Sequence, residues 1–333
     1  MMKKALMLSE KTDLFKDVYK SETKAKISSF ANLEDKVYSS SDLSEIDTSE
    51  VSFIFSTWGM PTFSQDYINK KFPKLEAVFY AAGTVQKFAR SFLSNNVKVF
   101  SAWQANAIPV AEFTLAQIIL ANKGYYQALN KTKIQNFSSA KKYCTNLSGN
   151  FNTKIGILGA GMIGKYLINL LKPFSFEIFV FDPFMSQEIA KELSVKLCDL
   201  DYIFKNCDII SNHLANNENT LRMLNYQHFS EMKDYATFIN TGRGAQVVEC
   251  DLVRAFTENP TKTALLDVTK PEPPTENHKF YFMDNVFLSP HIAGSMNNEV
   301  ARMGEFMACE FERYMKNEKL LYEVNLKMLE TMA

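Results

Sequence analysis

Three polar residues that could act together on a carbonyl group follow separate strand-like runs in the C-terminal half of the sequence. Arg243 ends INTGR, Glu272 lies in DVTKPEPP, and His291 follows VFLSP. An imidazole exchanges protons near neutral pH, and a neighbouring carboxylate favours its charged form and fixes its tautomer. A guanidinium can bind a carboxylate through two parallel hydrogen bonds. We therefore predict Arg243, Glu272 and His291 as a catalytic set for hydride transfer, with Asp267 facing the same crevice.

Each of these side chains, taken alone, also has an ordinary structural interpretation. Arg243 could be a solvated residue beside a glycine turn, and Glu272 could belong to an exposed proline-rich loop. His291 could be a structural histidine, and Asp267 could cap a strand end. Their order along the chain, behind a dinucleotide motif, favours the catalytic interpretation.

The dinucleotide motif is the hexapeptide Gly159-Ala160-Gly161-Met162-Ile163-Gly164, a G-x-G-x-x-G pattern. A strand-like run (KIGIL) precedes it, a helical run (MIGKYLINLLK) follows it, and a second strand-like run (EIFVF) ends at Asp182. In this context Gly159 permits the tight turn, Gly161 lets the backbone approach a pyrophosphate, and Gly164 lets helix and strand pack closely. The phosphates are expected to meet free N–H groups and the positive end of the helix dipole.

Asp182 decides which dinucleotide we expect. Its carboxylate can accept hydrogen bonds from the ribose hydroxyls, whereas a 2′-phosphate would face its negative charge. The sequence therefore predicts NAD rather than NADP. The alternative is a glycine-rich turn in a flavodoxin-like fold that binds no ligand.

Alternating strand-like and helical runs must position these residues. The predicted strands are 4–9, 51–57, 75–81 and 97–102 in the N-terminal part, then 154–159, 177–182, 208–214, 236–241, 263–268 and 286–290. Helical segments separate most of them, which predicts βα units and two doubly wound parallel sheets in an α/β fold. The strands are rich in β-branched and aromatic residues without polar alternation, as expected for strands that are buried on both faces.

Two long helices are predicted besides these units. The first spans 108–127, with Pro109 near its start, where a missing N–H costs nothing. Apolar residues surround this helix almost entirely, which predicts burial between domains or subunits. The second spans 297–317 and precedes a short tail.

The composition argues against several classes of protein. The 333 residues are 46% hydrophobic, enough for two cores, and 37 Lys and Arg residues balance 37 Asp and Glu residues. Without long runs of like charge we expect no nucleic-acid or membrane-surface partner, and no window is apolar enough to span a membrane. The five cysteines are scattered, and the first residues form no signal-peptide core. We predict reduced thiols, no metal site and a cytoplasmic location.

Long stretches of the sequence resemble the D-2-hydroxyacid dehydrogenase family (D-isomer specific, NAD-dependent), over roughly residues 75 to 310. GAGMIGKYLINLLKPFSFEIFVFDP is similar to the nucleotide segment of that family, and INTGRGAQVVECDLVRAF to its arginine motif. DVTKPEPP and NVFLSPHIAG are similar to its glutamate and histidine motifs. ANAIPVAEFTLAQIILA is similar to its long inter-domain helix.

The resemblance implies site residues and an architecture. The catalytic set that it implies is Arg243, Glu272 and His291. The NAD contacts that it implies are Gly159, Gly161, Met162, Ile163, Gly164, Asp182, His213, Leu214, Ala215, Thr220, Thr241, Gly242, Asp267, Ala293 and Gly294. It implies a Rossmann NAD-binding domain (106–296) inserted in a discontinuous, flavodoxin-like substrate-binding domain (1–105 plus 297–333), and a homodimer built around the 108–127 helix.

The chain departs from the family pattern mainly around the substrate. Val85-Gln86 stands where the family often has an acidic or amide residue. The Ala82-Gly83-Thr84 turn could still offer backbone N–H groups to a substrate carboxylate. Ala215 replaces a common proline, and Ser175 replaces a common glycine. These changes leave the expected fold as it is. They mean that the shape of the pocket for the substrate's side chain does not follow from the resemblance.

Tryptophans and the remaining histidines receive weaker interpretations. Trp58 and Trp103 follow two N-terminal strands, where they could line an apolar or aromatic substrate pocket or pack in a core. We interpret His213 as a packing residue or a backbone contact to the cofactor, and His228 and His278 as surface residues.

The function that we expect is hydride transfer between NAD(H) and a 2-oxo acid / D-2-hydroxy acid pair. His291 serves as acid and base, Glu272 supports it, and Arg243 anchors the substrate carboxylate. Two alternatives stay open at this point. One is an NAD(H)-responsive sensor or scaffold protein of the same fold, and the other is a dehydrogenase for a smaller donor such as formate or phosphite.

Overall fold

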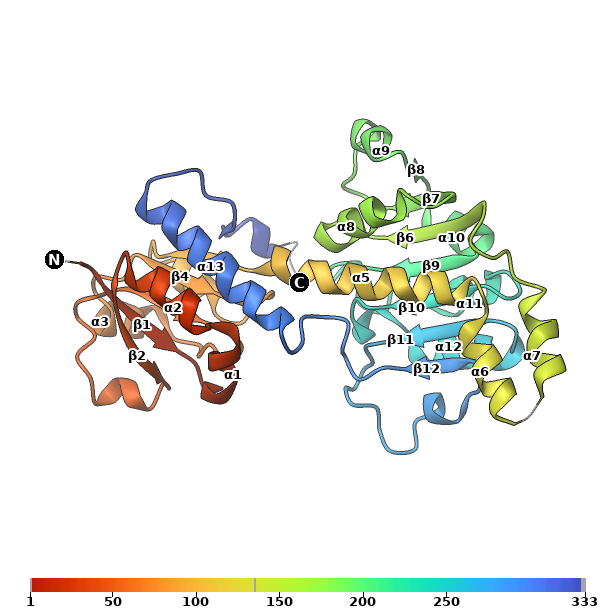
Figure 1. The fold of residues 1–333 in the computed structure, drawn as a ribbon, viewed down its shortest axis with the longest axis horizontal. Helices are drawn as coiled ribbons and strands as arrows, with labels where there is room; N and C mark the ends of the chain where they lie inside the picture. The colour runs from red at the N-terminus through yellow and green to blue at the C-terminus, as the bar shows by residue number, and fades with distance from the viewer. Residues whose placement is uncertain (1, 135, 331–333) are drawn as a thin grey trace. The chain divides into compact units, whose positions relative to one another are not determined.

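The computed structural model describes residues 2–134 and 136–330, which form two compact units. Unit 1 comprises Met1–Asn106 and Ser295–Ala333, and unit 2 comprises Ala107–Gly294. Each unit is built on one largely parallel β-sheet with helices packed against it (Figure 1). The predicted α/β fold class, with two doubly wound parallel-sheet domains, is confirmed.

Within the described residues, unit 1 has a six-stranded sheet in the order β13-β5-β4-β3-β1-β2. Its strands are β1 (Lys4–Leu8), β2 (Asn32–Tyr38), β3 (Val51–Ser56), β4 (Ala77–Tyr80), β5 (Lys98–Ser101) and β13 (Glu323–Val324). Its helices are α1 (Thr12–Val18), α2 (Ser21–Ser28), α3 (Gln65–Lys71), α4 (Ala89–Leu93) and α13 (Glu299–Met315). The strands are parallel except for β13, which runs antiparallel to β5. Helices α1 and α2 pack on α13, which also contacts β4 and β5.

Aromatic side chains fill the core of unit 1. Phe79 of β4 stacks on Phe55 of β3 at 5.2 Å and on Phe100 of β5 at 4.7 Å between ring centroids. Phe311 of α13 meets Phe79 edge-on at 5.1 Å. Side chains on both faces of these strands are buried, which explains why their sequences show no polar alternation.

Two strands of unit 1, β2 and the short β13, were not predicted from the sequence. β2, with the sequence NLEDKVY, pairs with β1 at the edge of the sheet, and most of its side chains are exposed. Charged side chains on an edge strand discourage pairing with another chain. Because of these charges, the sequence of β2 contains no apolar run by which the strand could be predicted.

The long helix predicted for 108–127 is two helices in the structure. α5 spans Trp103–Ala121 and α6 spans Tyr125–Lys133. Pro109 therefore lies inside α5 rather than near its start, and that prediction was wrong because the helix already begins shortly after β5. Gly124, with φ of 68°, separates the two helices, and a Cβ there would collide with Leu147.

The sheet of unit 2, again within the described residues, has seven parallel strands in the order β12-β11-β10-β9-β6-β7-β8. They are β6 (Thr153–Leu158), β7 (Phe176–Phe181), β8 (Lys196–Leu197), β9 (Ile209–Asn212), β10 (Thr237–Asn240), β11 (Thr263–Leu266) and β12 (Val286–Leu288). The helices that follow α6 are α7 (Phe137–Cys144), α8 (Met162–Leu171), α9 (Gln187–Leu193), α10 (Leu200–Asn206), α11 (Tyr226–Glu231) and α12 (Glu249–Glu258).

The strand order of unit 2 reverses between β6 and β9. The chain runs outward from β6 to β8, then returns to place β9 on the other side of β6. In sheets of this kind, ligands bind beyond the carboxyl ends of the strands at such a reversal. We therefore expect a ligand site among the residues that follow β6, β7, β9, β10, β11 and β12.

No described helix is both long and apolar enough to cross a membrane.

Candidate active site

The turn between β6 and α8 has the backbone that its glycines predict. Gly159 has φ of 85°, and a Cβ there would lie 2.9 Å from the backbone of His213 and Leu214. A Cβ on Gly164 would collide with the carbonyl oxygen of Gly159. Around Gly161, by contrast, a Cβ would meet nothing within 4 Å, and α8 begins at the next residue. An open backbone at a helix N-terminus fits a pyrophosphate group.

Asp182 follows β7, and its carboxylate is tied to the glycine turn. Its Oδ2 accepts a hydrogen bond from the N–H of Ala160 at 2.7 Å, and its Oδ1 accepts one from the N–H of Phe184 at 2.8 Å. A carboxylate oxygen has room for more than one donor. Both oxygens therefore keep capacity for ribose hydroxyls, so the residues of this turn fit an NAD cofactor.

The segment after β9 carries the predicted contacts from His213 to Thr220. His213 is buried, with Nε2 at 2.8 Å from the Ser211 hydroxyl and Nδ1 at 3.3 Å from that of Thr241. Burial lowers the pKa of His213 to about 3, so this histidine is neutral and unsuited to proton transfer. Thr220 donates to the carbonyl of Ala215 at 2.6 Å and thereby closes the loop.

Three buried amide side chains, which the sequence analysis did not single out, hold the turn that carries Arg243. Asn212 donates to Asn240 at 3.0 Å and to Gln246 at 2.7 Å. Asn240 accepts from the N–H of Gly242 at 3.1 Å, and Gln246 accepts from the N–H of Arg243 at 3.2 Å. Gln246 also donates to the carbonyls of the segment after β9, at 2.8 and 3.0 Å. This network ties the ends of β9 and β10 together.

Arg243 itself is half-buried beside Glu272. Its Nη1 donates to the carbonyl of Gly242 at 2.7 Å. Burial lowers the pKa of the Arg243 guanidinium, while the nearby charge of Glu272 acts in the opposite direction. Because arginine stays protonated in proteins, the group presents a fixed positive charge close to Glu272.

Glu272 and His291 are in direct polar contact. His291 Nδ1 lies 2.6 Å from Glu272 Oε1, and both side chains are exposed to nearly half of their area. Among the described residues, the His291 ring makes no other hydrogen bond. A carboxylate on Nδ1 leaves Nε2 as the atom that can exchange a proton with a ligand.

Asp267 holds the segment from which His291 projects. Its carboxylate accepts hydrogen bonds from the hydroxyl of Ser289 at 2.6 Å and from the N–H groups of Ile292 and Ala293 at 2.9 Å. The N–H of His291 donates to the carbonyl of Asp267 at 3.0 Å. These contacts fix His291 at φ of 54°, in the left-handed region, where a non-glycine residue is held only by its surroundings.

The predicted substrate contacts other than Arg243 lie in unit 1. Ala82 and Gly83 form the turn after β4, where the buried Ser101 donates to their carbonyls at 2.9 and 2.6 Å. In the described part of the chain, the N–H groups of Gly83 and Thr84 donate to no other residue. The turn thus has its carbonyls satisfied and two donors available.

Both tryptophans are half-buried and pack against the core of unit 1. Trp103 meets Tyr322 edge-on at 6.3 Å, and the carbonyl of Trp58 accepts from Ser9. These contacts favour the packing interpretation, and the pocket interpretation stays a prediction. His228 and His278, which we expected on the surface, are both half-buried: His228 takes part in the cap of α11, and His278 packs on Phe280.

Sequence reasoning missed Asn212, Asn240 and Gln246 although a signal exists. Each is an amide residue close to apolar residues, in the stretches DIISNHL, ATFINT and GAQVV. A buried amide needs a hydrogen-bonding partner, so such residues mark places where segments must be tied together. The described residues contain no group of three or more His, Cys, Asp or Glu side chains arranged to hold a metal ion.

Comparison with known proteins identifies the relatives of this arrangement. The family model described as "D-isomer specific 2-hydroxyacid dehydrogenase, NAD binding domain" matches residues 115–293. The D-3-phosphoglycerate dehydrogenase of Archaeoglobus fulgidus is 29% identical over 234 residues, which cover 70% of this chain and 44% of that protein. The chain thus spans less than half the length of this relative.

Solved structures share the fold at low sequence identity. The apo form of the D-mandelate dehydrogenase of Rhodotorula graminis superposes with a TM-score of 0.81 at 15% identity, covering 98% of each chain. A D-isomer specific 2-hydroxyacid dehydrogenase of Lactobacillus delbrueckii, solved as an NAD complex, gives 0.76 at 18% identity, covering 97% of this chain and all of that one. At these identities the likeness concerns the fold alone.

Proposed function

The chain belongs to the family of D-isomer specific 2-hydroxyacid dehydrogenases and carries its NAD-binding domain, and we propose that it reduces a 2-oxo acid to the D-2-hydroxy acid with NADH, or runs the reverse reaction. The observation that carries the proposal is the 2.6 Å contact between His291 and Glu272, with Arg243 close by. An acid–base pair beside a fixed cation is what carbonyl reduction needs from a protein.

Each side chain of the set has one task in the proposed reaction. The bound cofactor supplies the hydride that reduces the carbonyl carbon. Arg243 binds the substrate carboxylate and polarises the carbonyl oxygen. His291 gives the proton on Nε2 to that oxygen, and Glu272, on Nδ1, stabilises the imidazolium and keeps the ring oriented. In oxidation the neutral His291 removes the hydroxyl proton instead.

The substrate end of the proposal draws on unit 1. The free N–H groups of Gly83 and Thr84 can bind a carboxylate, in the manner of an anion-binding turn. We assign unit 1 to substrate binding and unit 2 to cofactor binding. Closure of the substrate site would exclude water from the reacting atoms.

The first experiment follows NADH absorbance with a panel of 2-oxo acids graded by size and polarity, with NADPH in parallel. D-3-phosphoglycerate belongs to the panel in the oxidative direction because the Archaeoglobus relative is named for it. We expect turnover with NADH for at least one acid and little with NADPH, since Asp182 repels a 2′-phosphate. Tight NADH binding without turnover on any panel member would instead favour an NAD-responsive binding protein.

Arg243→Ala tests the assignment of the guanidinium. Loss of a half-buried charged partner of the substrate should lower kcat/KM by roughly 10²-fold or more. Arg254→Ala is the matched control, because Arg254 lies on α12 and pairs with Glu258 on the surface. Equal kcat/KM for Arg243→Ala and the wild-type protein would show that the carboxylate is anchored elsewhere.

We further propose a homodimer that forms around the segment 108–127. Tyr125 and Leu129 of α6 are apolar residues exposed to about two fifths of their area, which suits a partner surface. Light scattering during size-exclusion chromatography distinguishes a dimer from a monomer. A monomer at micromolar concentration would contradict this assignment and leave the catalytic proposal untouched.

A further inference from the structure

The segment that carries Glu272 is fastened at two points to one carboxylate, that of Glu249. Glu249 is the first residue of α12. Its Oε1 accepts a hydrogen bond from the N–H of Lys270 at 2.7 Å, and its Oε2 lies 3.3 Å from Nε2 of His278. Glu272 lies between Lys270 and His278 in the chain. One side chain therefore braces the segment on both sides of the proposed catalytic carboxylate.

The ring of His278 is oriented for this contact. Its Nδ1 accepts a hydrogen bond from the N–H of Phe280 at 3.3 Å, and the ring packs on that of Phe280 at 4.3 Å. With Nδ1 used as an acceptor, the proton of the neutral ring lies on Nε2, which faces Glu249.

Burial makes Glu249 unlike the other carboxylates of this region. Its side chain is 13% exposed, against 42% for Glu272 and 50% for Glu258 at the other end of α12. Burial raises the pKa of Glu249, while the N–H of Lys270 and the ring of His278 act in the opposite direction. In the described structure no Lys or Arg side chain pairs with it. A carboxylate in this position is stabilised chiefly by the segment that it braces.

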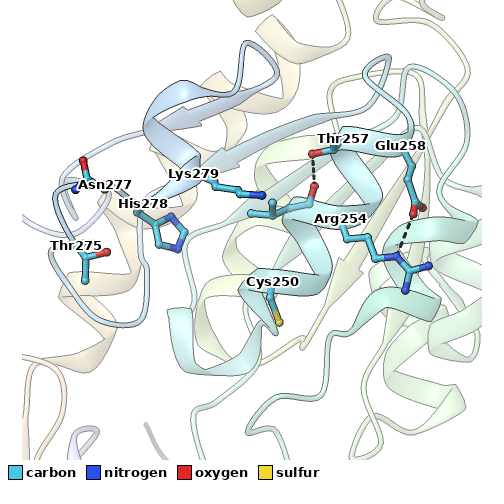
Figure 2. A pocket seen from close by; sticks show the side chains of 9 residues that line it. Cys250, Arg254, Thr257, Glu258, Thr275, Asn277, His278 and Lys279 are labelled. Atoms are coloured by element: carbon cyan, nitrogen blue, oxygen red, sulfur yellow. Dashed lines mark hydrogen bonds and ion pairs between the residues drawn. The ribbon is translucent and has the colours of Figure 1, made fainter.

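On the far side of the segment, Phe280 is buried in the same core cluster as Val253 and Phe256 of α12. A pocket of about 620 Å³ separates Thr275, Asn277, His278 and Lys279 from Cys250, Val253, Arg254, Thr257 and Glu258 of the helix. Figure 2 shows Thr275, Asn277 and His278 together on one side of the pocket, with Cys250 and Arg254 of α12 on another side. On the near side, Thr269 donates to the carbonyl of Pro271 at 2.8 Å. Without Glu249 the segment loses the hydrogen bond at Lys270 and the contact at His278, while Phe280 remains in the core.

We propose that Glu249 is a positioning residue that holds Glu272 against His291 by bracing Lys270 and His278. The inference rests on the proposed function, in which the contact between Glu272 and His291 supports proton transfer. Among the described residues, the polar contacts of the Glu249 side chain are with Lys270 and His278, and none is with the glycine turn, the segment after β9 or the Arg243 turn. Its loss should therefore slow the chemical step and spare cofactor binding.

The test compares Glu249→Ala, Glu249→Gln and Glu258→Ala in the full chain. Glu258→Ala is the control, because it removes from the same helix a carboxylate whose hydrogen bonds, among the described residues, are with Tyr226 and Arg254. We expect Glu249→Ala to lower kcat by roughly ten- to a hundredfold, the range for a small misplacement of a catalytic group. KM and the NADH dissociation constant should stay within about twofold. Glu249→Gln, whose amide oxygen can still accept from Lys270, should recover part of kcat, and Glu258→Ala should match the wild-type protein.

A purely structural role predicts a different pattern. If kcat of Glu249→Ala equals that of the wild-type protein, or if kcat falls only together with NADH affinity and thermal stability, the positioning role is overturned. Hydrogen exchange of the peptide covering 270–280 gives a readout that needs no turnover. Faster exchange in Glu249→Ala than in Glu258→Ala supports the brace, and equal exchange overturns it. If the wild-type protein turns over no acid of the panel, the proposed function fails. The hydrogen-exchange comparison still tests whether Glu249 holds the segment 270–280.

Discussion

Each of the two units contains its own largely parallel sheet, but the side chains at the ends of the strands differ between the units. In unit 1 the buried residues at these places are hydroxyls: Ser56, Thr57 and Ser101 bond backbone carbonyls of neighbouring segments. In unit 2 they include amides, an imidazole and a carboxylate, as with Asn240 and Asp267. A hydroxyl can fix a turn. The groups in unit 2 can fix a turn and also hold a charged residue in place beside it.

The distribution of residue types follows the same division. All four histidines of the chain lie in unit 2, whereas both tryptophans lie in unit 1. Unit 1 has packed aromatic rings and a turn with free backbone donors, while unit 2 holds the pair of Glu272 and His291 that we propose for proton transfer. Two similar sheets can therefore have different tasks, and the residues at the strand ends distinguish them.

Among the variants that test the difference between the units, His291→Asn in unit 2 is expected to have the largest effect on kcat. Asparagine tolerates the left-handed backbone at this position, so the segment should keep its shape. Loss of the general acid should lower kcat by roughly 10²- to 10⁴-fold. Stopped-flow measurement of NADH oxidation gives kcat, and fluorescence titration gives the NADH dissociation constant, which should not change.

His228→Asn is the matched control, because His228 is a second histidine of unit 2 that lies at the start of α11. It should retain the kcat of the wild-type protein. Comparable losses in the two variants would mean that His291 has no special role, and the assignment of chemistry to the strand ends of unit 2 would fail.

Phe79→Ala should produce the largest loss of stability in unit 1. Phe79 is fully buried and stacks on Phe55 and Phe100. Removal of its ring should lower the free energy of unfolding by about 3–5 kcal/mol. Because both tryptophans lie in unit 1, urea unfolding followed by tryptophan fluorescence reports this unit. Phe229→Ala, in the core of unit 2, should leave that fluorescence transition nearly in place, and an equal shift would show that the units do not unfold separately.

Local patterns in the sequence were enough to predict most strands. Runs such as VSFIFST and EIFVFD are apolar throughout because their strands are buried on both faces, and each is found within a residue or two of its predicted place. β2 was missed because its exposed, charged residues carry no such pattern. α5 was placed too late because Pro109 was read as a start signal, although nothing in the sequence prevents the helix from beginning at Trp103.

The site was less accessible to sequence reasoning because its contacts join distant residues. A carboxylate suits an imidazole, so a partnership of Glu272 and His291 could be suggested from residue types. The link from Asn212 to Gln246 and the brace from Glu249 to His278 depend on which segments the fold brings together. The cofactor contact of Asp267 stays a prediction, whereas its contacts with the His291 segment were not predicted. The sequence predicts which residues follow the carboxyl end of a strand, but it does not predict which residues their side chains contact.

A pH-dependent loss of stability is expected from the buried His213 of unit 2. Burial lowers the pKa of His213 to about 3, and in the unfolded chain the pKa is about 6.5. The unfolded chain therefore binds a proton between these values. The stability that neutral His213 contributes is fully present above pH 6.5 and is lost as the pH falls toward 3. The slope from this residue is at most about 1.4 kcal/mol per pH unit.

His213→Gln removes that titration and keeps a polar side chain. Urea unfolding followed by far-ultraviolet circular dichroism, at steps between pH 7 and pH 4, should show a shallower loss of stability in the variant. His228, whose pKa burial also lowers, remains in both proteins, so the difference between the two curves isolates His213. Parallel curves would show that His213 is not buried in the folded protein.

The smallest effect is expected from Ser101→Ala, which removes a strand-end hydroxyl of unit 1. The hydroxyl of Ser101 bonds the carbonyls of Ala82 and Gly83, and a net hydrogen bond of this kind contributes about 1 kcal/mol to stability. Tryptophan fluorescence should report that loss in urea. If the turn binds the substrate carboxylate, KM for the best 2-oxo acid should rise a few-fold, while kcat and NADH affinity stay unchanged. A fall in kcat as large as that of His291→Asn would mean that a hydroxyl of unit 1 takes part in the chemistry, and the division of tasks between the units would not hold.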